Sequence, residues 1–334
     1  MSDLSPVLGS EEIIEPVTNL DRYGFSHVLA AYAGLKQPRR PFCSWIHGWI
    51  WWDELVKPED LLGPRNMPRD LSIVVGSSQQ VDMMRAAGYT NVLAGGVPLI
   101  YVPAQHVRRR PDTLLAFLAH SAEAERFDVL HGDYLDHLAS IRHHFERVYV
   151  SVFALDRNDK LNAEITRRGL FVLDGANPAD RNSMRRTRRC LEYFGHVSTN
   201  TMGSHVAYAL AAGCRTSIWS PIFRYDYDVL AKSAHGLSRD YVDRMSLVHD
   251  EPYLRNRFPG LFDTPPLSGY LDPALGSELL GARHLLTPDE VMQAAGWTMG
   301  VQLSGYLAGA VRRSHRQLRS LFAPGAPSGT RRCG

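Results

Sequence analysis

Residues 196–213 read HVSTNTMGSHVAYALAAG, and this stretch decides the fold class of the chain. It opens with β-prone residues and continues through small polar residues. It then places Val206, Ala209 and Leu210 at helical spacing before Gly213, a typical residue to end a helix. Residues 216–221 read TSIWSP and predict the next strand. A strand, a polar turn, a helix and a second strand in this order favour a parallel α/β sheet.

The polar turn within this stretch is the first candidate binding site. Ligands of parallel α/β sheets bind beyond the carboxyl ends of the strands, and the free N–H groups at the start of a helix favour a phosphate. The alternative is that one polar residue merely caps the helix. A cap needs only one such residue, whereas this turn carries several. We therefore interpret it as a phosphate-binding turn made of Ser198, Thr199, Asn200, Thr201, Gly203, Ser204 and His205.

The composition describes a soluble globular protein with ample material for a core. The 334 residues are 44% hydrophobic with a formal net charge of +2, so the composition gives no reason to expect a nucleic-acid partner. The four cysteines are scattered without metal-ligand spacing, which fits a reducing compartment and argues against a disulfide scaffold. Residues 1–16 lack the apolar core of a signal peptide, and no segment has the length of a membrane span. We expect a cytoplasmic protein.

Arginines are clustered at residues 108–110, 185–189 and 312–319. Such clusters are usually solvated faces, and the sharper alternative is contact with anionic sugars, phosphates or lipid head groups. The third cluster lies in an expected long helix over residues 299–322. That helix is a candidate for peripheral contact with anionic lipid at the inner face of the membrane, and packing across the protein with a solvated arginine face is the alternative.

Strands and helices alternate along most of the chain. Further strands are expected at residues 41–46, 71–75, 92–94, 113–119, 148–153 and 170–173, with helices at 23–33, 80–87, 133–147, 162–168 and 181–194. Residues 103–111 interrupt this pattern with prolines and arginines. We therefore predict an α/β protein with two Rossmann-like domains facing across a cleft, and one continuous doubly wound sheet is the alternative. The expected parts are an irregular arm up to about residue 20 within a domain 1–105, a domain 112–284, C-terminal helices 285–322 and a disordered tail 323–334.

Histidines recur in polar turns that follow expected strands. His47 would belong to the first domain, and His120 and His205 to the second. We take His47 and His120 as candidate catalytic residues, with His47 as a general base because an imidazole titrates near neutrality. Ser121 would join His120 and the phosphate-binding turn. The alternative for each histidine is a structural role, and the rival bases are the carboxylates Asp53, Glu54, Asp128 and Asp133.

A tryptophan cluster follows His47 in the sequence. Trp49, Trp51 and Trp52 would stack on sugar faces and so bind an acceptor, or they would form a local core. The segment Asp226-Tyr227-Asp228 has Asp-x-Asp spacing, but it does not follow a strand, so we predict no obligatory metal or cofactor. Phosphate-binding P-loops, Gly-x-Gly-x-x-Gly dinucleotide motifs and Gly-x-Ser-x-Gly elbows do not occur in the sequence, which disfavours those enzyme classes.

Four segments resemble glycosyltransferase-like proteins of bacterial capsule and lipopolysaccharide gene clusters. They are STNTMGSHVAYAL (198–210), LAHS (118–121), GGVPLIY (95–101) and HGW (47–49), and the similarity covers roughly residues 40–220. These proteins are similar to the GT-B class of transferases, which includes bacterial enzymes that use CMP-activated sialic acid or Kdo.

The resemblance implies an inverting, metal-independent transfer of a sugar from a nucleotide-activated donor to a polysaccharide or glycolipid acceptor. The donor would lie on the second domain, with its phosphate at the Ser/Thr-rich turn, and the acceptor on the first. Two alternatives remain open: a nucleotide-sugar 2-epimerase on the same architecture, and a binding or assembly subunit without catalytic activity.

Overall fold

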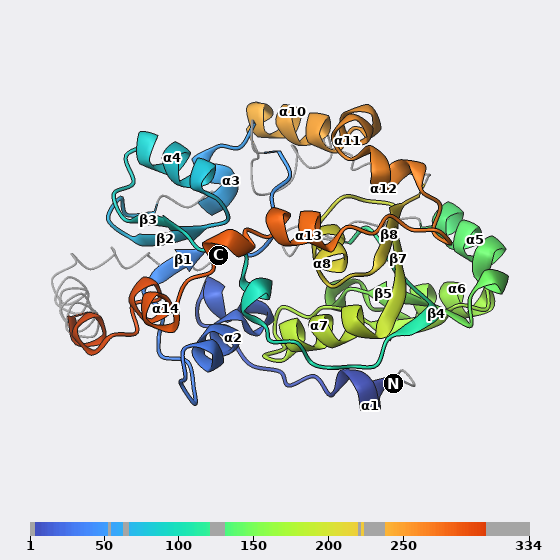
Figure 1. Cartoon of the computed structure of the whole chain (residues 1–334), viewed down its shortest axis with the longest axis horizontal. Coiled ribbons are helices and arrows are strands. Elements are labelled where there is room, and N and C mark those ends of the chain that lie inside the picture. Colours follow the sequence, from blue (N-terminus) through green and yellow to red (C-terminus); the bar gives the residue numbers. More distant parts are fainter. Residues whose placement is uncertain are drawn as a thin grey trace, which may run out of the picture.

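A computed structural model of the chain describes residues 4–52, 55–62, 67–120, 131–219, 222–223 and 238–304. The strands of these residues form two parallel sheets, one of three strands and one of five. Figure 1 shows the smaller sheet on the left and the larger one on the right. All eight strands lie where the sequence predicts them, with shifts of a few residues at their ends. The chain is therefore a mixed α/β protein with parallel sheets.

The first unit consists of the three-stranded sheet and the helices near it. Its strands are β1 (Cys43–Trp45), β2 (Ser72–Val75) and β3 (Val92–Ala94), which pair in that order. The three apolar residues of β2 are buried, as expected of a central parallel strand. The helices of this unit are α2 (Phe25–Tyr32), α3 (Pro58–Leu62) and α4 (Ser78–Ala86), with the 3₁₀ helices η1 (Asn19–Gly24) and η2 (Pro98–Tyr101).

Helix α2 begins later than the apolar spacing predicts. The sequence pattern suggested a helix from Tyr23, but Tyr23 and Gly24 have φ angles of 58° and 74°. A right-handed helix excludes positive φ angles, so the helix can begin only at Phe25. The reason for this geometry is tertiary, because a Cβ atom on Gly24 would lie 1.9 Å from the carbonyl oxygen of Arg181. The backbone here is shaped by its contact with a distant segment.

The second unit is a doubly wound sheet. Its strands are β4 (Arg110–Phe117), β5 (Arg147–Val152), β6 (Phe171–Asp174), β7 (Phe194–Thr199) and β8 (Arg215–Ile218), and their spatial order is β6-β5-β4-β7-β8. All four pairings are parallel. The chain moves outward from β4 in one direction and then, after β6, in the other. The order therefore reverses between β4 and β7, which is the topological switch point of the sheet.

Helices cover both faces of this sheet. Leu114 and Ala116 of β4 share a core with helices α5 (Gly132–Ile141) and α6 (Asp159–Arg167). Leu115 points to the opposite core, which also contains residues of α7 (Ser183–Tyr193) and α8 (Ser204–Ala211). This second core continues into the first unit, so the two units share one hydrophobic interior. Two short 3₁₀ helices complete the unit, η3 (Arg142–His144) and η4 (Ala154–Asp156).

Both described ends of the chain cross to the other unit. Residues 4–18, here the N-terminal arm, contain helix α1 (Ser5–Leu8), which packs on α7, and Ile13 forms a β-bridge with Asp180. The expectation of an irregular arm thus misses this short helix. At the other end, α14 (Pro288–Ala294) begins with a capping box at Thr287 and packs on β2, where the Ser72 hydroxyl donates to the Ala294 carbonyl (2.9 Å).

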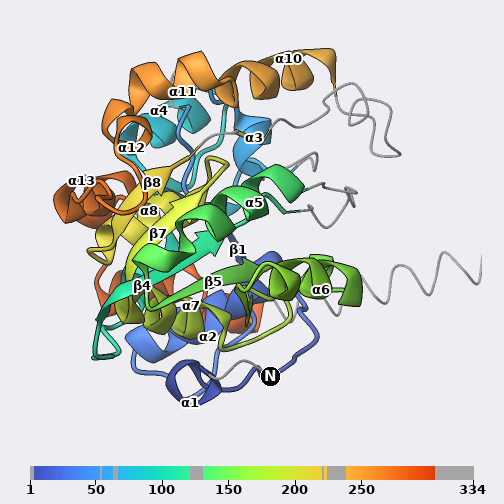
Figure 2. The same cartoon turned by 90° about the vertical axis from the view of Figure 1, so that its right-hand side faces the viewer.

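The segment between β8 and α14 contains short helices. They are α10 (Arg239–Val248), α11 (Glu251–Arg257), α12 (Pro259–Asp263) and α13 (Pro273–Leu279), followed by the 3₁₀ helix η5 (Ala282–His284). Figure 2 shows α10 and α11 along one edge of the molecule, away from α1 and α2.

Some predictions concern residues outside the described ranges. Of the long helix predicted over residues 299–322, only 299–304 are described, and they are helical. The arginines at 312–319, and with them the predicted membrane contact, lie outside, as does the tail 323–334. None of the helices that the structure describes combines the length and apolar character needed to cross a bilayer.

Candidate active site

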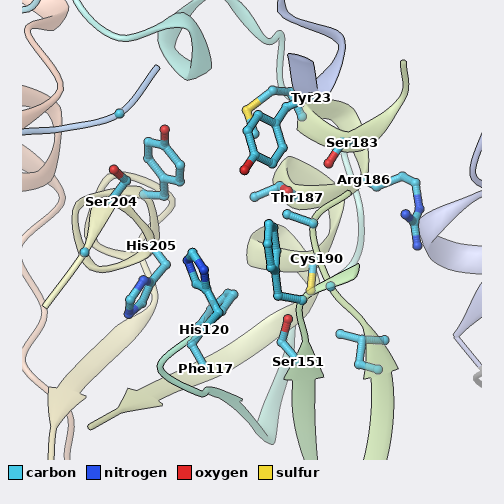
Figure 3. A pocket seen from close by; sticks show the side chains of 18 of the residues that line it. Tyr23, Phe117, His120, Ser151, Ser183, Arg186, Thr187, Cys190, Ser204 and His205 are labelled. Carbon is cyan, nitrogen blue, oxygen red and sulfur yellow. The ribbon is translucent and has the colours of Figure 1, made fainter. Parts of the chain in front are cut away.

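A cavity of about 310 Å³ lies at the carboxyl edge of the five-stranded sheet. It is lined by residues at the ends of β4, β5, β6 and β7, together with residues of α7 and α8. The first unit closes the opposite side with Tyr23, Phe25, His47 and Gly48, and the N-terminal arm adds Leu8. The cavity therefore spans the switch point between β4 and β7, where ligands of open α/β sheets bind. Figure 3 shows it from close by, and we refer to it as the pocket.

The start of helix α8 forms one wall of the pocket. Thr201, Gly203, Ser204 and His205 of the polar turn line it, and phosphate binding by this turn stays a prediction. The first N–H groups of a helix have no carbonyl partner within the helix, and the positive end of its dipole lies there. A Cβ atom on Gly203 would lie 2.9 Å from the His205 ring, so glycine permits the close approach of the turn to this histidine. This wall can accept an anionic oxygen.

Two turns that are far apart in the sequence meet beside α8. The Trp49 amide donates to the Ser204 hydroxyl (2.9 Å), and the Tyr208 hydroxyl donates to the His47 carbonyl (3.4 Å). A Cβ atom on Gly48 would lie 2.4 Å from the Ser204 hydroxyl oxygen, so the contact requires glycine there. The structure thus brings the His47 turn to the polar turn before α8.

His47 lies in the pocket with both ring nitrogens buried, and neither has a hydrogen-bond partner among the described residues. Its ring stacks on Phe25 at a centroid distance of 5.3 Å. Burial, with a smaller contribution from the Arg22 charge, lowers the pKa of His47 to about 4. We expected the His47 imidazole to titrate near neutrality, and this expectation is wrong for its buried environment. Buried polar atoms normally have hydrogen-bond partners, so the two ring nitrogens are available to bind a ligand in the pocket.

His205 is held in a single orientation at the base of α8. Its ring stacks on Phe117 (4.9 Å), and its Nε2 atom lies 3.0 Å from the Thr199 hydroxyl. The Thr199 hydroxyl also accepts a hydrogen bond from the Thr201 amide (3.2 Å), so it stabilises the polar turn. Thr199 does not itself line the pocket. Burial, with the nearby His120, lowers the pKa of His205 to about 3. His205 is therefore neutral at physiological pH.

His120 is the third histidine of the pocket. It follows β4, and its ring packs against Phe153 at a centroid distance of 4.4 Å. Figure 3 shows His120, which follows β4, beside His205, which lies in the first turn of α8 after β7. The structure places His47, His120 and His205 in the lining of one pocket, and their catalytic and binding roles stay predictions.

Other predicted residues lie elsewhere. Ser198 points to the opposite face of the sheet, where its hydroxyl accepts from Tyr134 (2.9 Å), because successive residues of a strand face opposite sides. Asn200 is buried outside the lining, its carbonyl accepts the Phe223 amide (2.7 Å), and its side-chain oxygen has no partner. Among the rival bases, Asp133 is exposed in the first turn of α5. The other rival bases are Asp53, Glu54 and Asp128, and they lie outside the described residues. The same holds for Ser121 and for the segment Asp226-Tyr227-Asp228.

The tryptophan cluster is buried beside the pocket and does not line it. Trp49, Trp51 and Trp52 are 6–9% exposed, Trp49 meets Phe258 edge to face (5.6 Å), and the Trp51 indole donates to the Val248 carbonyl (3.0 Å). This position favours the local-core alternative. Acceptor binding by these rings stays a prediction.

One wall of the pocket was missed by the sequence reasoning. Helix α7 contributes Ser183, Arg186, Thr187 and Cys190, and the first unit contributes Tyr23. The Arg186 guanidinium points away from the pocket in Figure 3, because it pairs with Asp180 and Glu11 (both 3.1 Å). The arginine cluster at 185–189 was the available signal, but its sequence does not tell which members face inward.

The described residues contain no group of three or more histidine, cysteine or carboxylate side chains placed to hold a metal ion. The pocket offers backbone amides, hydroxyls and imidazoles at its polar end, and aromatic and aliphatic walls elsewhere. It can therefore hold an anionic oxygen at α8 and position a hydroxyl beside His47.

No family model and no curated protein matches the chain. The solved structures that resemble it weakly include two of TarM. One is an S. aureus TarM mutant in complex with fondaparinux, alpha-GlcNAc-glycerol and UDP, with 11% identity, a TM-score of 0.32, and coverage of 71% of this chain and 45% of that one. The other is TarM, with 11% identity, a TM-score of 0.28, and coverage of 71% and 43%. This chain spans less than half the length of either, and we base no argument on so weak a likeness.

Proposed function

We propose that the chain is a GT-B-like glycosyltransferase that moves a sugar from a nucleotide-activated donor to a polysaccharide or glycolipid acceptor. The single observation that carries the proposal is the pocket at the switch point of the second sheet, where the start of α8 and the orphaned imidazole of His47 face the same cavity. The volume of about 310 Å³ falls within the range of small-molecule sites. The sequence resemblance of these turns to glycosyltransferase-like proteins supports the same reading.

The proposed chemistry is an inverting displacement at the anomeric carbon. The acceptor hydroxyl oxygen attacks this carbon, and the bond from carbon to the phosphate oxygen breaks with its electron pair leaving on the phosphate. The amides at the start of α8 stabilise the developing negative charge, and the acceptor proton passes to His47. No step requires a metal ion.

The low pKa of His47 is compatible with this role once a donor is bound. Burial disfavours the charged form of His47. The described lining supplies one carboxylate that could stabilise this charge, Asp174 at the end of β6. An anionic phosphate a few ångströms away favours the charged imidazole and raises the pKa. We therefore propose that donor binding itself makes His47 a stronger base.

The donor class is the sharpest question, and a thermal-shift panel of CMP-, UDP-, GDP- and dTDP-sugars tests it. A ligand at 100 times its dissociation constant stabilises the folded state by about 2.7 kcal/mol, which gives a clear shift. Stabilisation by one nucleotide class, followed by transfer to an oligosaccharide array, is the expected result. CMP-sugars come first in the panel because of the sequence resemblance.

Other outcomes distinguish the alternatives. Turnover of a UDP-sugar without an acceptor would indicate a 2-epimerase. Failure of every nucleotide to stabilise the protein would overturn the transferase and leave a binding or assembly subunit.

A further inference from the structure

Tyr23 has an unusual backbone conformation for an aromatic residue. Its φ and ψ angles are 58° and 12°, and within the described ranges His106 is the only other non-glycine residue with positive φ. The left-handed region is unfavourable for a bulky side chain, so the surrounding structure must hold the residue there. Such residues are concentrated at ligand sites, and this makes the position of the side chain informative.

The strained conformation is fixed by the segment that precedes α7. The Tyr23 amide donates to the Pro178 carbonyl (2.9 Å), and Gly24 lies so close to Arg181 that no side chain fits between them. On the other side, the Asp21 carboxylate accepts from the Ser26 hydroxyl (2.7 Å) and the Thr18 amide (2.7 Å). The backbone around Tyr23 is therefore anchored at both ends.

The result of this anchoring is that the Tyr23 side chain projects into the pocket. Figure 3 shows its hydroxyl directed into the cavity, between Ser204 on one side and Thr187 on the other. The ring meets His47 edge to face at a centroid distance of 6.5 Å and packs against Phe25 at 5.7 Å. Within the described part of the chain the structure gives the hydroxyl no hydrogen-bond partner, although the residue is partly buried against the core.

Burial raises the pKa of Tyr23 to about 12, against a smaller opposing contribution from Arg22. The phenol therefore keeps its proton throughout the physiological range. It can donate a hydrogen bond to a ligand oxygen, and it cannot serve as a base.

We propose that Tyr23 contacts the acceptor substrate and that its hydroxyl hydrogen-bonds an oxygen of the acceptor sugar beside His47. The proposal rests on the proposed glycosyl transfer and deepens it. In an in-line displacement the acceptor approaches from the side of the base, and Tyr23 shares the wall of His47 and Phe25, facing α8. The acceptor must then present a hydroxyl or ring oxygen to this wall, which selects a polar, sugar-like nucleophile over an apolar alcohol.

The test is Tyr23→Phe, which removes only the hydroxyl, with Tyr193→Phe as the matched control. Tyr193 is half-buried in the second unit, outside the pocket, and makes a ring contact with Phe194. The measurements are the melting temperature, the dissociation constant of the donor nucleotide, and the acceptor KM and kcat. The acceptors are methyl glycosides of the sugars that are glycosylated on the oligosaccharide array. A lost hydrogen bond of ordinary strength predicts a rise in acceptor KM of about 5- to 10-fold in Tyr23→Phe.

We expect the melting temperature and the donor affinity of Tyr23→Phe to stay at the wild-type values, and Tyr193→Phe to match wild type throughout. A lower melting temperature in Tyr23→Phe would show that the hydroxyl stabilises the fold and would overturn the proposal. Unchanged acceptor KM, or a loss of donor affinity in its place, would overturn it as well. A wild-type protein that binds a nucleotide-sugar but glycosylates no acceptor also overturns it. If the wild-type protein binds no nucleotide at all, the proposed function fails first, and this proposal fails with it.

Discussion

The Trp49 amide donates a hydrogen bond to the Ser204 hydroxyl across 2.9 Å. Trp49 belongs to the first unit and Ser204 is the first residue of α8 in the second, 155 positions later in the chain. The contact fixes the turn of His47 against the polar turn before α8. The geometry of the pocket therefore depends on both sheets and also on a hydrogen bond between loops of the two units.

Ser204→Ala should lower both stability and donor affinity. The variant leaves the largely buried Trp49 amide without an acceptor, which costs about 1–2 kcal/mol in free energy of unfolding. It also removes a hydroxyl from the wall proposed to bind phosphate. Urea denaturation and nucleotide titration measure the two effects. The control is Ser140→Ala, whose exposed hydroxyl donates only to the His137 carbonyl. Equal stability of both variants would show that the inter-unit bond contributes nothing.

His47→Ala should abolish transfer and leave donor binding intact. General bases contribute roughly 10²- to 10⁴-fold to the rate, so kcat should fall by at least that range. Isothermal titration of the donor supplies the binding measurement. Full transfer by the variant would exclude His47 as the base.

The pH dependence of kcat/KM gives a further test of His47. Burial lowers the pKa of its imidazole from 6.5 to about 4 in the free protein, so the neutral form persists well below neutrality. Activity that needs neutral His47 should be present above this pKa and be lost as the pH falls through about 4, rather than near 6.5. Circular dichroism at each pH checks that the fold persists. An acid limb at 6–7 would assign the base to another group.

Stability should fall on acidification for a related reason. Burial lowers the pKa of His131 to about 4 and, with a contribution from His120, that of His205 to about 3, whereas both groups titrate near 6.5 in an unfolded chain. The unfolded state therefore binds protons first as the pH drops below 6.5, and the free energy of unfolding decreases until the folded pKa values are reached. Each pH unit between the folded and unfolded pKa values corresponds to about 1.4 kcal/mol per group. Urea midpoints at pH 7.5 and 5 that coincide would contradict this.

Asp180→Asn should detach the N-terminal arm. The fully buried Asp180 carboxylate accepts the Glu12 and Asn182 amides (2.8 and 2.9 Å) and pairs with Arg186 (3.1 Å). Removing its charge breaks one of the two ion pairs of Arg186, which keeps its pair with Glu11 (3.1 Å), and takes a charged acceptor from two amides, so we expect a loss of about 1–3 kcal/mol. Asp243→Asn is the control, since its ion pair with Arg239 is exposed and should contribute under about 1 kcal/mol. Limited proteolysis of the arm reports the detachment directly, and resistance equal to wild type would argue against it.

Trp51→Phe separates the two interpretations of the tryptophan cluster. The variant loses the indole bond to the Val248 carbonyl and part of a buried ring, so we expect the free energy of unfolding to fall by about 1–3 kcal/mol. The local-core interpretation predicts an unchanged acceptor KM. A raised KM with unchanged stability would favour sugar stacking instead.

The regular elements could be predicted because each carries its own local signal. The β2 strand is a short run of buried aliphatic residues, and Thr287 with Glu290 forms the capping box that its spacing predicts. The turn before α8 could be singled out as a candidate site because its polar residues exceed what a cap needs. These signals depend on neighbours in the sequence, so no tertiary information was required.

The residues that were missed depend on contacts between distant segments. Tyr23 was assigned to a helix because its apolar neighbours have helical spacing, and only the approach of Arg181 and Pro178 forces its positive φ. Ser198 was assigned to the pocket because the sequence does not reveal which face of β7 meets α8. Burial likewise determines the pKa of His47, and a motif carries no information about burial.

The crossing of the two ends of the chain has a consequence for biosynthesis. The arm completes the surface of α7, and α14 covers β2, so each half of the molecule is finished by residues from the opposite terminus. During translation the strands of the first unit are synthesised long before α14, which covers β2. Their apolar surface therefore stays exposed until the C-terminal segment is made. Fragments divided near residue 105 should therefore aggregate when expressed alone, while co-expression of both pieces offers a route to a soluble complex.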